Sequence, residues 1–110
     1  MKNITQEEWD KVLAETPTRE NLFYLMEYTD KSDEAWEQLL KQGMTHDDLL
    51  YIIRYTDKSD EAWELLLKQK PTNYDLRYII RYTDKSDEAQ KVLDERNKKV
   101  KRMIDIIKER

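Results

Sequence analysis

The eight-residue stretch Tyr-Thr-Asp-Lys-Ser-Asp-Glu-Ala occurs three times in this chain, beginning at Tyr28, Tyr55 and Tyr82. Successive copies are 27 residues apart. A fixed period of this size is typical of proteins in which one small structural unit stacks on the next. Because a unit this short cannot bury an apolar face by itself, the period predicts that neighbouring units pack against one another.

The composition favours helices throughout. Charged residues make up 40% of the 110 residues and hydrophobic residues 38%, with only one Gly and two Pro. Such a chain is poor in the residues that form the turns of a sheet, and its apolar residues recur periodically, which argues against disorder. The formal net charge of −4 argues against nucleic acid as a partner. There is no Cys, so disulfides and thiolate chemistry are excluded.

One helix of each unit is predicted at residues 19–29, 46–56 and 73–83. A Thr precedes each of these helices and an acid or amide follows three residues later, which is an N-terminal capping pattern. The apolar residues of each helix recur at i, i+3 and i+4, which indicates one buried stripe. The stripes are Leu22, Leu25 and Met26, then Leu49, Ile52 and Ile53, then Leu76, Ile79 and Ile80.

The second helix of each unit is predicted at residues 33–42 and 60–69, with Ser32, Ser59 and Ser86 as its N-caps. We expect it to bury Ala35, Trp36, Leu39 and Leu40 in one copy, and Ala62, Trp63, Leu66 and Leu67 in the next. A capping box at Thr5 predicts a further helix over 6–15. Its Trp9 aligns with Trp36 and Trp63, so this first helix is half a unit.

The segment from Asp87 to Arg110 has two interpretations. It contains no Gly or Pro, so one long helix is open to it. The 27-residue register favours a different outcome, in which the helix breaks near residues 96–98 and residues 99–109 fold back as a cap. Asn97 would stand at the break, since Asn tolerates the left-handed conformation of a helix end. A continuous helix would instead extend an apolar stripe beyond the units, which invites dimerisation.

Together these patterns predict an all-α fold, a right-handed α-hairpin solenoid of about three 27-residue repeats with helical caps. One domain covers residues 1–110. It consists of an N-terminal half-repeat cap (1–17), three repeats (18–44, 45–71 and 72–98) and a C-terminal capping helix (99–110).

This organisation resembles α-hairpin solenoid repeat proteins of tetratricopeptide-like or HEAT-like architecture, although the 27-residue unit is shorter than theirs. The resemblance is one of architecture and covers nearly the whole chain. Residues 51–62 are identical to residues 78–89, and residues 28–37 to residues 55–64. Identity at exposed charged positions makes the chain similar to a consensus or de novo designed repeat protein, or to the product of a recent duplication.

Tyrosines and arginines beside the buried stripes form the candidate binding surface. Tyr and Arg are enriched at interface hot spots, so a row of them could hold a peptide or protein segment. The alternative is that the tyrosine rings only fill gaps between repeats. The candidate residues are Tyr24, Tyr28, Tyr51, Tyr55, Arg54, Tyr78, Arg81 and Tyr82.

No catalytic, cofactor-binding or metal-binding residue is identifiable, and we expect the chain not to be an enzyme. The carboxylates around Asp57–Glu61 lack the length and the Gly of a calcium loop, His46 is expected to be solvated, and the three Trp are expected in the core. The basic cluster 96–102 is expected to be a solvated surface. We expect a cytoplasmic location, no nucleic-acid or membrane partner, and a monomer, with a homodimer through the C-terminal helix as the alternative.

Overall fold

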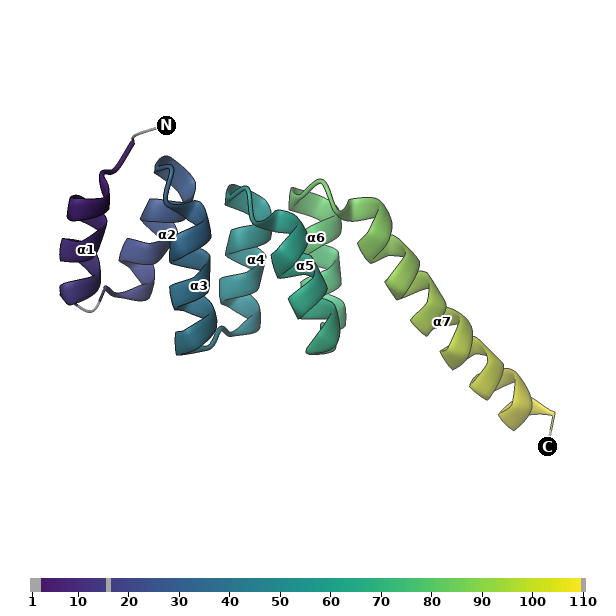
Figure 1. Cartoon of the computed structure of the whole chain (residues 1–110). Helices are drawn as coiled ribbons and strands as arrows, with labels where there is room; N and C mark the ends of the chain where they lie inside the picture. Colours follow the sequence, from purple (N-terminus) through teal and green to yellow (C-terminus); the bar gives the residue numbers. More distant parts are fainter. Residues whose placement is uncertain (1–2, 16, 110) are drawn as a thin grey trace. The chain divides into compact units, whose positions relative to one another are not determined.

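The computed structural model describes residues 3–15 and 17–109, and over these residues the fold is all-α with no strand. Seven helices follow one another in the described part of the chain (Figure 1). They are α1 (Gln6–Ala14), α2 (Arg19–Tyr28), α3 (Ser32–Gln42), α4 (His46–Tyr55), α5 (Ser59–Lys68), α6 (Asn73–Tyr82) and α7 (Ser86–Lys108). The chain forms two compact units, Met1–Gln69 (unit 1) and Lys70–Arg110 (unit 2).

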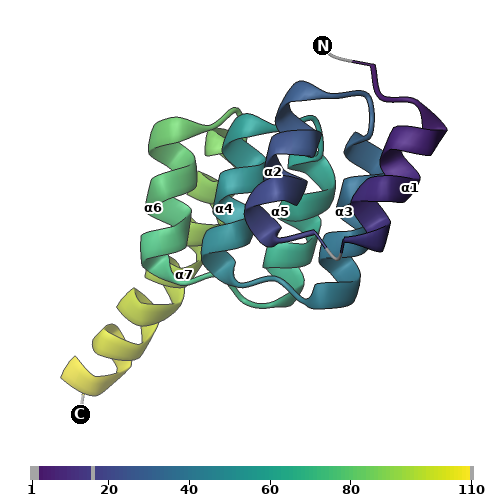
Figure 2. The ribbon, with the colours of Figure 1, turned by 90° about the vertical axis from the view of Figure 1, so that its left-hand side faces the viewer.

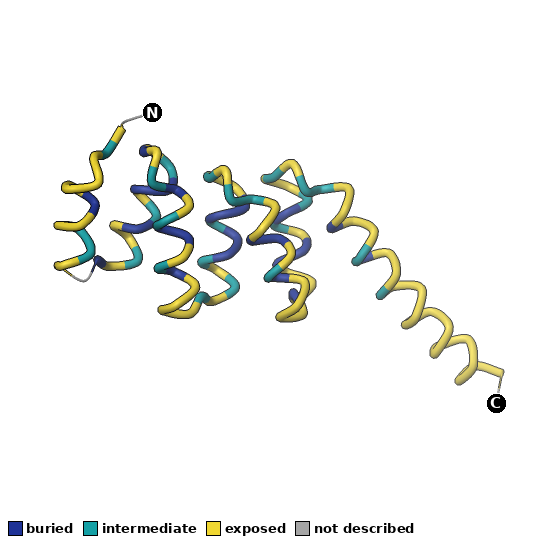
Figure 3. The backbone as a smooth tube through the Cα atoms, in the orientation of Figure 1, coloured by how far each residue is buried: buried dark blue, intermediate teal, exposed yellow. Residues whose placement is uncertain are grey.

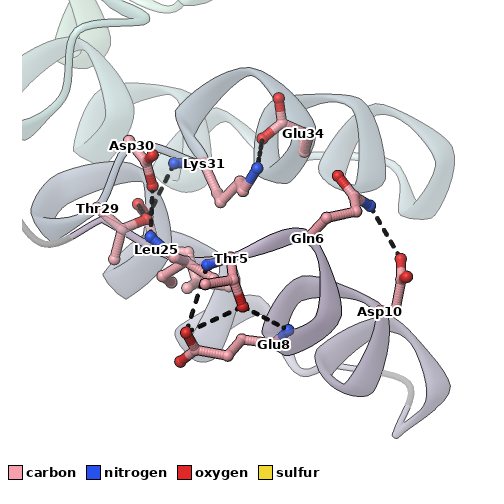
Figure 4. A network of polar contacts seen from close by, with 10 residues as sticks. Thr5, Gln6, Glu8, Asp10, Leu25, Thr29, Asp30, Lys31 and Glu34 are labelled. Carbon is pink, nitrogen blue, oxygen red and sulfur yellow. Dashed lines mark hydrogen bonds and ion pairs between the residues drawn. The ribbon is translucent and has the colours of Figure 1, made fainter.

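Threonine side chains begin four of the helices, as the sequence predicts. The hydroxyl of each threonine accepts a hydrogen bond from the backbone N–H three residues later, and the four residues are Thr5, Thr18, Thr45 and Thr72. At three of them an acidic side chain returns the bond to the Thr backbone N–H and completes a capping box. Figure 4 shows the first of these boxes, between Thr5 and Glu8.

A second set of threonines closes the turn inside each hairpin. The Thr29 hydroxyl donates to the carbonyl of Leu25 at 2.6 Å and accepts from the N–H of Lys31 at 3.1 Å (Figure 4). Thr56 and Thr83 make the same pair of hydrogen bonds. This turn shifts the helix start by one residue, so the prediction that Ser32, Ser59 and Ser86 are N-caps is wrong. Lys31, Lys58 and Lys85 hold the cap positions and make no side-chain cap bond.

The core of unit 1 lies between the paired helices α2 and α3, and between α4 and α5. The predicted stripes are buried there: Leu22, Met26, Leu39, Leu49, Ile52 and Leu66 are inaccessible to solvent. All three Trp are buried as well, as expected. Leu40 and Leu67 are the exceptions, because they are exposed rather than buried. Both stand one position beyond the last buried leucine, where the helix has turned away from the core.

Polar contacts join one hairpin of unit 1 to the next. Arg19 at the start of α2 pairs with Asp48 of α4. Ser32 of α3 donates to Asp57, and Lys58 pairs with Asp33. α2 and α4 therefore lie side by side (Figure 2), with the starts of α3 and α5 joined behind them.

The N-terminal helix α1 is attached to the same unit by backbone groups at both ends. The N–H of Ile4 donates to Asp30 Oδ1 at 2.8 Å, which ties the start of α1 to the turn between α2 and α3 (Figure 4). After α1, the carbonyl of Pro17 accepts a hydrogen bond from the Gln42 amide at 3.3 Å. Trp9 is the buried residue of α1.

In unit 2, α6 packs against the first half of α7. Leu76 and Ile79 of α6 are buried together with Ala89 and Leu93 of α7. The last link between the two helices is a hydrogen bond of 3.0 Å from Arg96 to the Asn73 side chain. Every described residue after Arg96 is exposed, and the second half of α7 extends past α6 without a covering element in this unit (Figure 3).

The break that the register favoured near residues 96–98 is absent, because α7 is one uninterrupted helix from Ser86 to Lys108. The chain does turn at the two preceding register positions, where Gly43 and Lys70 have positive φ angles of 84° and 61°. After each of those turns a Thr N-cap starts the next helix. At the third position Lys99 replaces this Thr and Arg102 replaces the acid three residues on. With no cap to start a new helix, continuing the old one satisfies more backbone hydrogen bonds.

Candidate binding surface

The tyrosines of unit 1 form ring pairs along α2 and α4. Tyr24 and Tyr28 have ring centroids 5.0 Å apart, and Tyr51 and Tyr55 are 4.8 Å apart. This is the separation expected for residues one helical turn apart, at i and i+4. Tyr24, Tyr28 and Tyr55 remain 57%, 51% and 42% exposed. We call these three residues the unit 1 tyrosine face.

Tyr51 plays a different role, since it joins the two hairpins. Its hydroxyl donates to Glu27 Oε2 at 2.6 Å, and its ring lies 5.0 Å from that of Phe23 with the planes tilted by 31°. Both partners belong to α2, whereas Tyr51 belongs to α4. Tyr51 is therefore half-buried and fills the gap between neighbouring hairpins, which is the alternative that the sequence left open for this residue.

The carboxylate of Glu27 sets the electrostatics of this part of the surface. Its hydrogen bond raises the pKa of the Tyr51 hydroxyl to about 12, because the phenol loses a strong bond when it ionises. The negative charge of Glu27 also raises the pKa of the neighbouring Tyr28. Both phenols thus remain neutral hydrogen-bond donors at physiological pH.

A shallow groove of about 300 Å³ runs over these residues. It is lined by Glu20, Phe23, Tyr24, Glu27, Tyr28 and Tyr51. Arg54 stands beside it on α4, with its guanidinium carbon 4.8 Å from the Tyr55 ring centroid. Aromatic walls with a few polar groups are typical of surfaces that hold a ligand.

In unit 2 the corresponding residues form one continuous row on α6. A groove of about 290 Å³ is lined by five residues that we call the α6 stripe: Tyr74, Arg77, Tyr78, Arg81 and Tyr82. Their spacing of i, i+3, i+4, i+7 and i+8 places all five on one face of the helix. The Tyr78 and Tyr82 rings are 4.9 Å apart, and the Arg81 guanidinium carbon lies 5.6 Å from the Tyr82 centroid.

The structure therefore groups the eight predicted residues as Tyr24, Tyr28, Tyr51, Arg54 and Tyr55 in unit 1 and Tyr78, Arg81 and Tyr82 in unit 2. Tyr74 and Arg77 were not among the binding residues predicted from the sequence. Neither residue is repeated in the other copies, so a comparison of the copies does not select it. The residues equivalent to Tyr74 are Glu20 and Asp47. The residues equivalent to Arg77 are Phe23 and Leu50. These departures from the repeat were the available signal.

The remaining candidate residues take structural positions. Asp57 accepts from Ser32, and no group of three or more metal-ligating side chains occurs among residues 3–15 and 17–109. His46, expected to be solvated, is half-buried as the first residue of α4. Lys58 is hydrogen-bonded to Asp33, which raises the pKa of its ammonium group. In the described part of the chain, none of the helices combines the length and apolar character that crossing a membrane requires.

No protein-family model matches this chain, and comparison with curated proteins and with solved structures gave no match either. The geometry of the two tyrosine-lined grooves is therefore the basis for inferring a function.

Proposed function

We propose that this chain is a helical-repeat scaffold without catalytic activity, built as an α-hairpin solenoid, which binds a peptide or protein segment through its tyrosines. The observation that carries the proposal is the exposure of Tyr24, Tyr28 and Tyr55 in adjacent ring pairs beside a groove. Rings that served only as packing would be covered by neighbouring helices, as the ring of Tyr51 is in part. The sequence identity between copies supports an origin by recent duplication or by engineering.

The contacts within unit 1 support the solenoid arrangement. The pairs Arg19–Asp48, Ser32–Asp57 and Glu27–Tyr51 all join residues separated by about one repeat length. Contacts limited to the neighbouring hairpin are what a stacked array requires. An extended surface of repeated side chains is the usual binding device of such arrays.

A displayed peptide library, selected on the immobilised chain, tests the binding proposal. Peptides so selected should bind the Tyr24→Ser/Tyr28→Ser/Tyr55→Ser variant more weakly by about tenfold or more. The matched control is Leu40→Ser/Leu67→Ser, which removes exposed apolar side chains from α3 and α5. Circular dichroism establishes that both variants are folded. Equal binding to the tyrosine variant and to the chain would refute the proposal.

A second function, self-association through α7, is favoured by one specific observation. Val100, Met103, Ile104 and Ile107 form a stripe at i, i+3, i+4 and i+7, and they are between 44% and 67% exposed. An apolar stripe of this kind on a helix that extends past its neighbours suits a helix–helix dimer. Two such helices also carry like charges, since Arg96–Lys108 holds six basic residues and one acidic residue.

Sedimentation velocity over a range of concentrations tests this second proposal. We expect the mass to rise from 13.5 kDa towards that of a dimer, and to rise further in high salt, which screens the repulsion between basic residues. Ile104→Asp/Ile107→Asp should abolish the association, whereas Lys91→Gln should not. A monomer under all of these conditions would exclude a function that depends on α7 pairing.

A further inference from the structure

We propose that the α6 stripe binds an acidic segment of a protein partner, with Arg77 and Arg81 pairing with carboxylates and the three tyrosines packing against the segment. This inference rests on the proposed binding function and specifies the chemistry of the bound segment. It commits to a peptide that carries Asp or Glu side chains in an extended conformation.

The first support is the absence of an acidic partner for the two arginines. No ion pair with a carboxylate is found for Arg77 or Arg81 among residues 3–15 and 17–109, and the guanidinium of Arg81 lies over the Tyr82 ring. The stripe itself contains no Asp or Glu. Two adjacent guanidinium groups without a carboxylate repel each other, so a bound anion removes an unfavourable interaction as well as forming a favourable one.

The second support is the spacing of the two arginines. Four residues of α-helix advance by about 6 Å. Alternate side chains of an extended peptide lie on the same face and are separated by about 6.6–6.8 Å. Carboxylates at positions i and i+2 of an extended segment can therefore meet Arg77 and Arg81 together. The exposed Tyr74 and Tyr82 extend the row beyond the arginines at either end.

The distribution of charge along the chain favours unit 2, and not unit 1, as the part that binds an acidic segment. In the register of the repeats, unit 1 has Glu20 and Asp47 where Tyr74 stands. Where Arg81 stands, it has Glu27 in one copy and Arg54 in the other. Unit 1 carries eight Lys and Arg against sixteen Asp and Glu, whereas unit 2 carries twelve against eight. An acidic peptide is thus repelled by unit 1 and attracted by unit 2. A long polyanion such as single-stranded nucleic acid is disfavoured by the net charge of −4 of the whole chain, which makes a short acidic segment the better fit.

The test uses a peptide of about ten residues with Glu at alternate positions separated by Ser, a neutral fluorophore, and fluorescence anisotropy with the full chain. Two further peptides serve as comparisons, one with Gln in place of every Glu and one with the same composition but with Glu in adjacent pairs. We expect saturable binding of the alternating Glu peptide, weaker binding of the adjacent-pair peptide and loss of binding to the Gln peptide. Raising the salt concentration should weaken the binding.

Two double variants make the test specific. Arg77→Gln/Arg81→Gln should weaken binding of the alternating peptide by about tenfold or more. Lys91→Gln/Lys101→Gln removes the same charge from exposed positions on α7 and should change the affinity by less than about twofold. If the α7 variant weakens binding as much as the arginine variant, the attraction is a general property of unit 2 and the inference is overturned.

The remaining outcomes separate this inference from the proposed function. Equal binding of the Glu and Gln peptides overturns the acidic specificity but leaves the binding function standing. If no Glu peptide binds while the display selection yields tyrosine-dependent peptides, the inference alone fails. Tighter binding of oligothymidylate that depends on the same arginines would assign the stripe to nucleic acid. Salt-sensitive dimerisation that Arg77→Gln/Arg81→Gln abolishes would assign it to a second copy of the chain, and would overturn the inference as well.

Discussion

At the scale of single residues, one threonine hydroxyl determines how each hairpin turns. Thr29, Thr56 and Thr83 each donate to a carbonyl of the helix that ends and accept from an N–H of the helix that begins. The N–H belongs to a helix start, where backbone donors have no partner within the helix. The carbonyl also accepts from the backbone N–H of the same threonine, so the hydroxyl adds a second hydrogen bond to it. A connection of this kind needs neither Gly nor Pro, which explains how a chain with so few of them forms three hairpins.

The substitution Thr29→Val should destabilise unit 1 by about 1–3 kcal/mol, because it keeps the shape of the side chain but leaves the half-buried N–H of Lys31 without its partner and removes one of the two hydrogen bonds to the carbonyl of Leu25. Urea denaturation measures the change in the free energy of unfolding. Thr29→Ser is the matched control, since it retains both hydrogen bonds and loses only a methyl group. Equal stability of the Val and Ser variants would show that the hydroxyl is dispensable.

The Glu27–Tyr51 pair predicts a dependence of stability on pH. Because folding raises the pKa of Tyr51 from 10.0 to about 12, the folded state favours the protonated phenol. This contribution to stability is complete below the unfolded pKa and is lost as the pH rises from 10.0 to about 12. In Glu27→Gln, the tyrosinate absorbance of Tyr51 should appear at lower pH. Glu20→Gln, which removes a carboxylate from the same groove without breaking this bond, should leave the titration of Tyr51 in place.

Residue type alone did not identify Tyr51 as a packing residue. Tyr24, Tyr51 and Tyr78 occupy equivalent register positions, yet Tyr24 is exposed and Tyr51 and Tyr78 are half-buried. The burial of Tyr51 comes from Phe23 and Glu27, which belong to another hairpin. A periodic pattern predicts which face of a helix is apolar, but it does not specify which neighbour covers a residue at the edge of that face.

At the scale of elements, the helix boundaries could be read from the sequence to within about a residue. Each of α2, α4 and α6 begins at the residue after its Thr and ends before the next one. Local capping decides these boundaries, and capping side chains are visible in the sequence. The course of α7 was predicted wrongly because periodicity was given more weight than the missing cap at Lys99.

Restoring the cap should break α7. The variant Asn97→Gly/Lys99→Thr/Arg102→Asp recreates the turn and capping residues found at Gly43, Thr45 and Asp48. We expect backbone NMR chemical shifts of the variant to show two helices separated near residue 97. The single variant Asn97→Gly, which weakens the helix by about 1 kcal/mol without supplying a cap, should retain one helix. An uninterrupted helix in the triple variant would disprove this account of the boundary.

At the scale of the whole molecule, stability should reside in residues before Lys99. The apolar side chains after Lys99 are all between 44% and 67% exposed, so they add little to the buried core: Val100, Met103, Ile104, Ile106 and Ile107. Removing residues 99–110 should therefore shift the melting temperature by less than about 4 °C, which corresponds to at most about 1 kcal/mol. Thermal unfolding at a low protein concentration, where the chain is monomeric, provides the measurement.

The comparison for this truncation is Leu93→Ala, which removes a buried side chain from the first half of α7 and should cost about 2–5 kcal/mol. A truncated chain that melts as early as Leu93→Ala would mean that the second half of α7 is packed in solution. The truncation would then have removed a cap rather than a free extension.

Because α7 is uninterrupted, the number of hairpins depends on where turn residues occur and not on how long the chain is. Met103, Ile106 and Ile107 stand in the register of Leu76, Ile79 and Ile80, so the apolar half of a further hairpin is already encoded. Three side chains between residues 97 and 102 decide whether that half folds back or extends outward. A few substitutions would thus decide whether the C-terminal residues pack against the preceding helices or form an exposed helix that other molecules can contact.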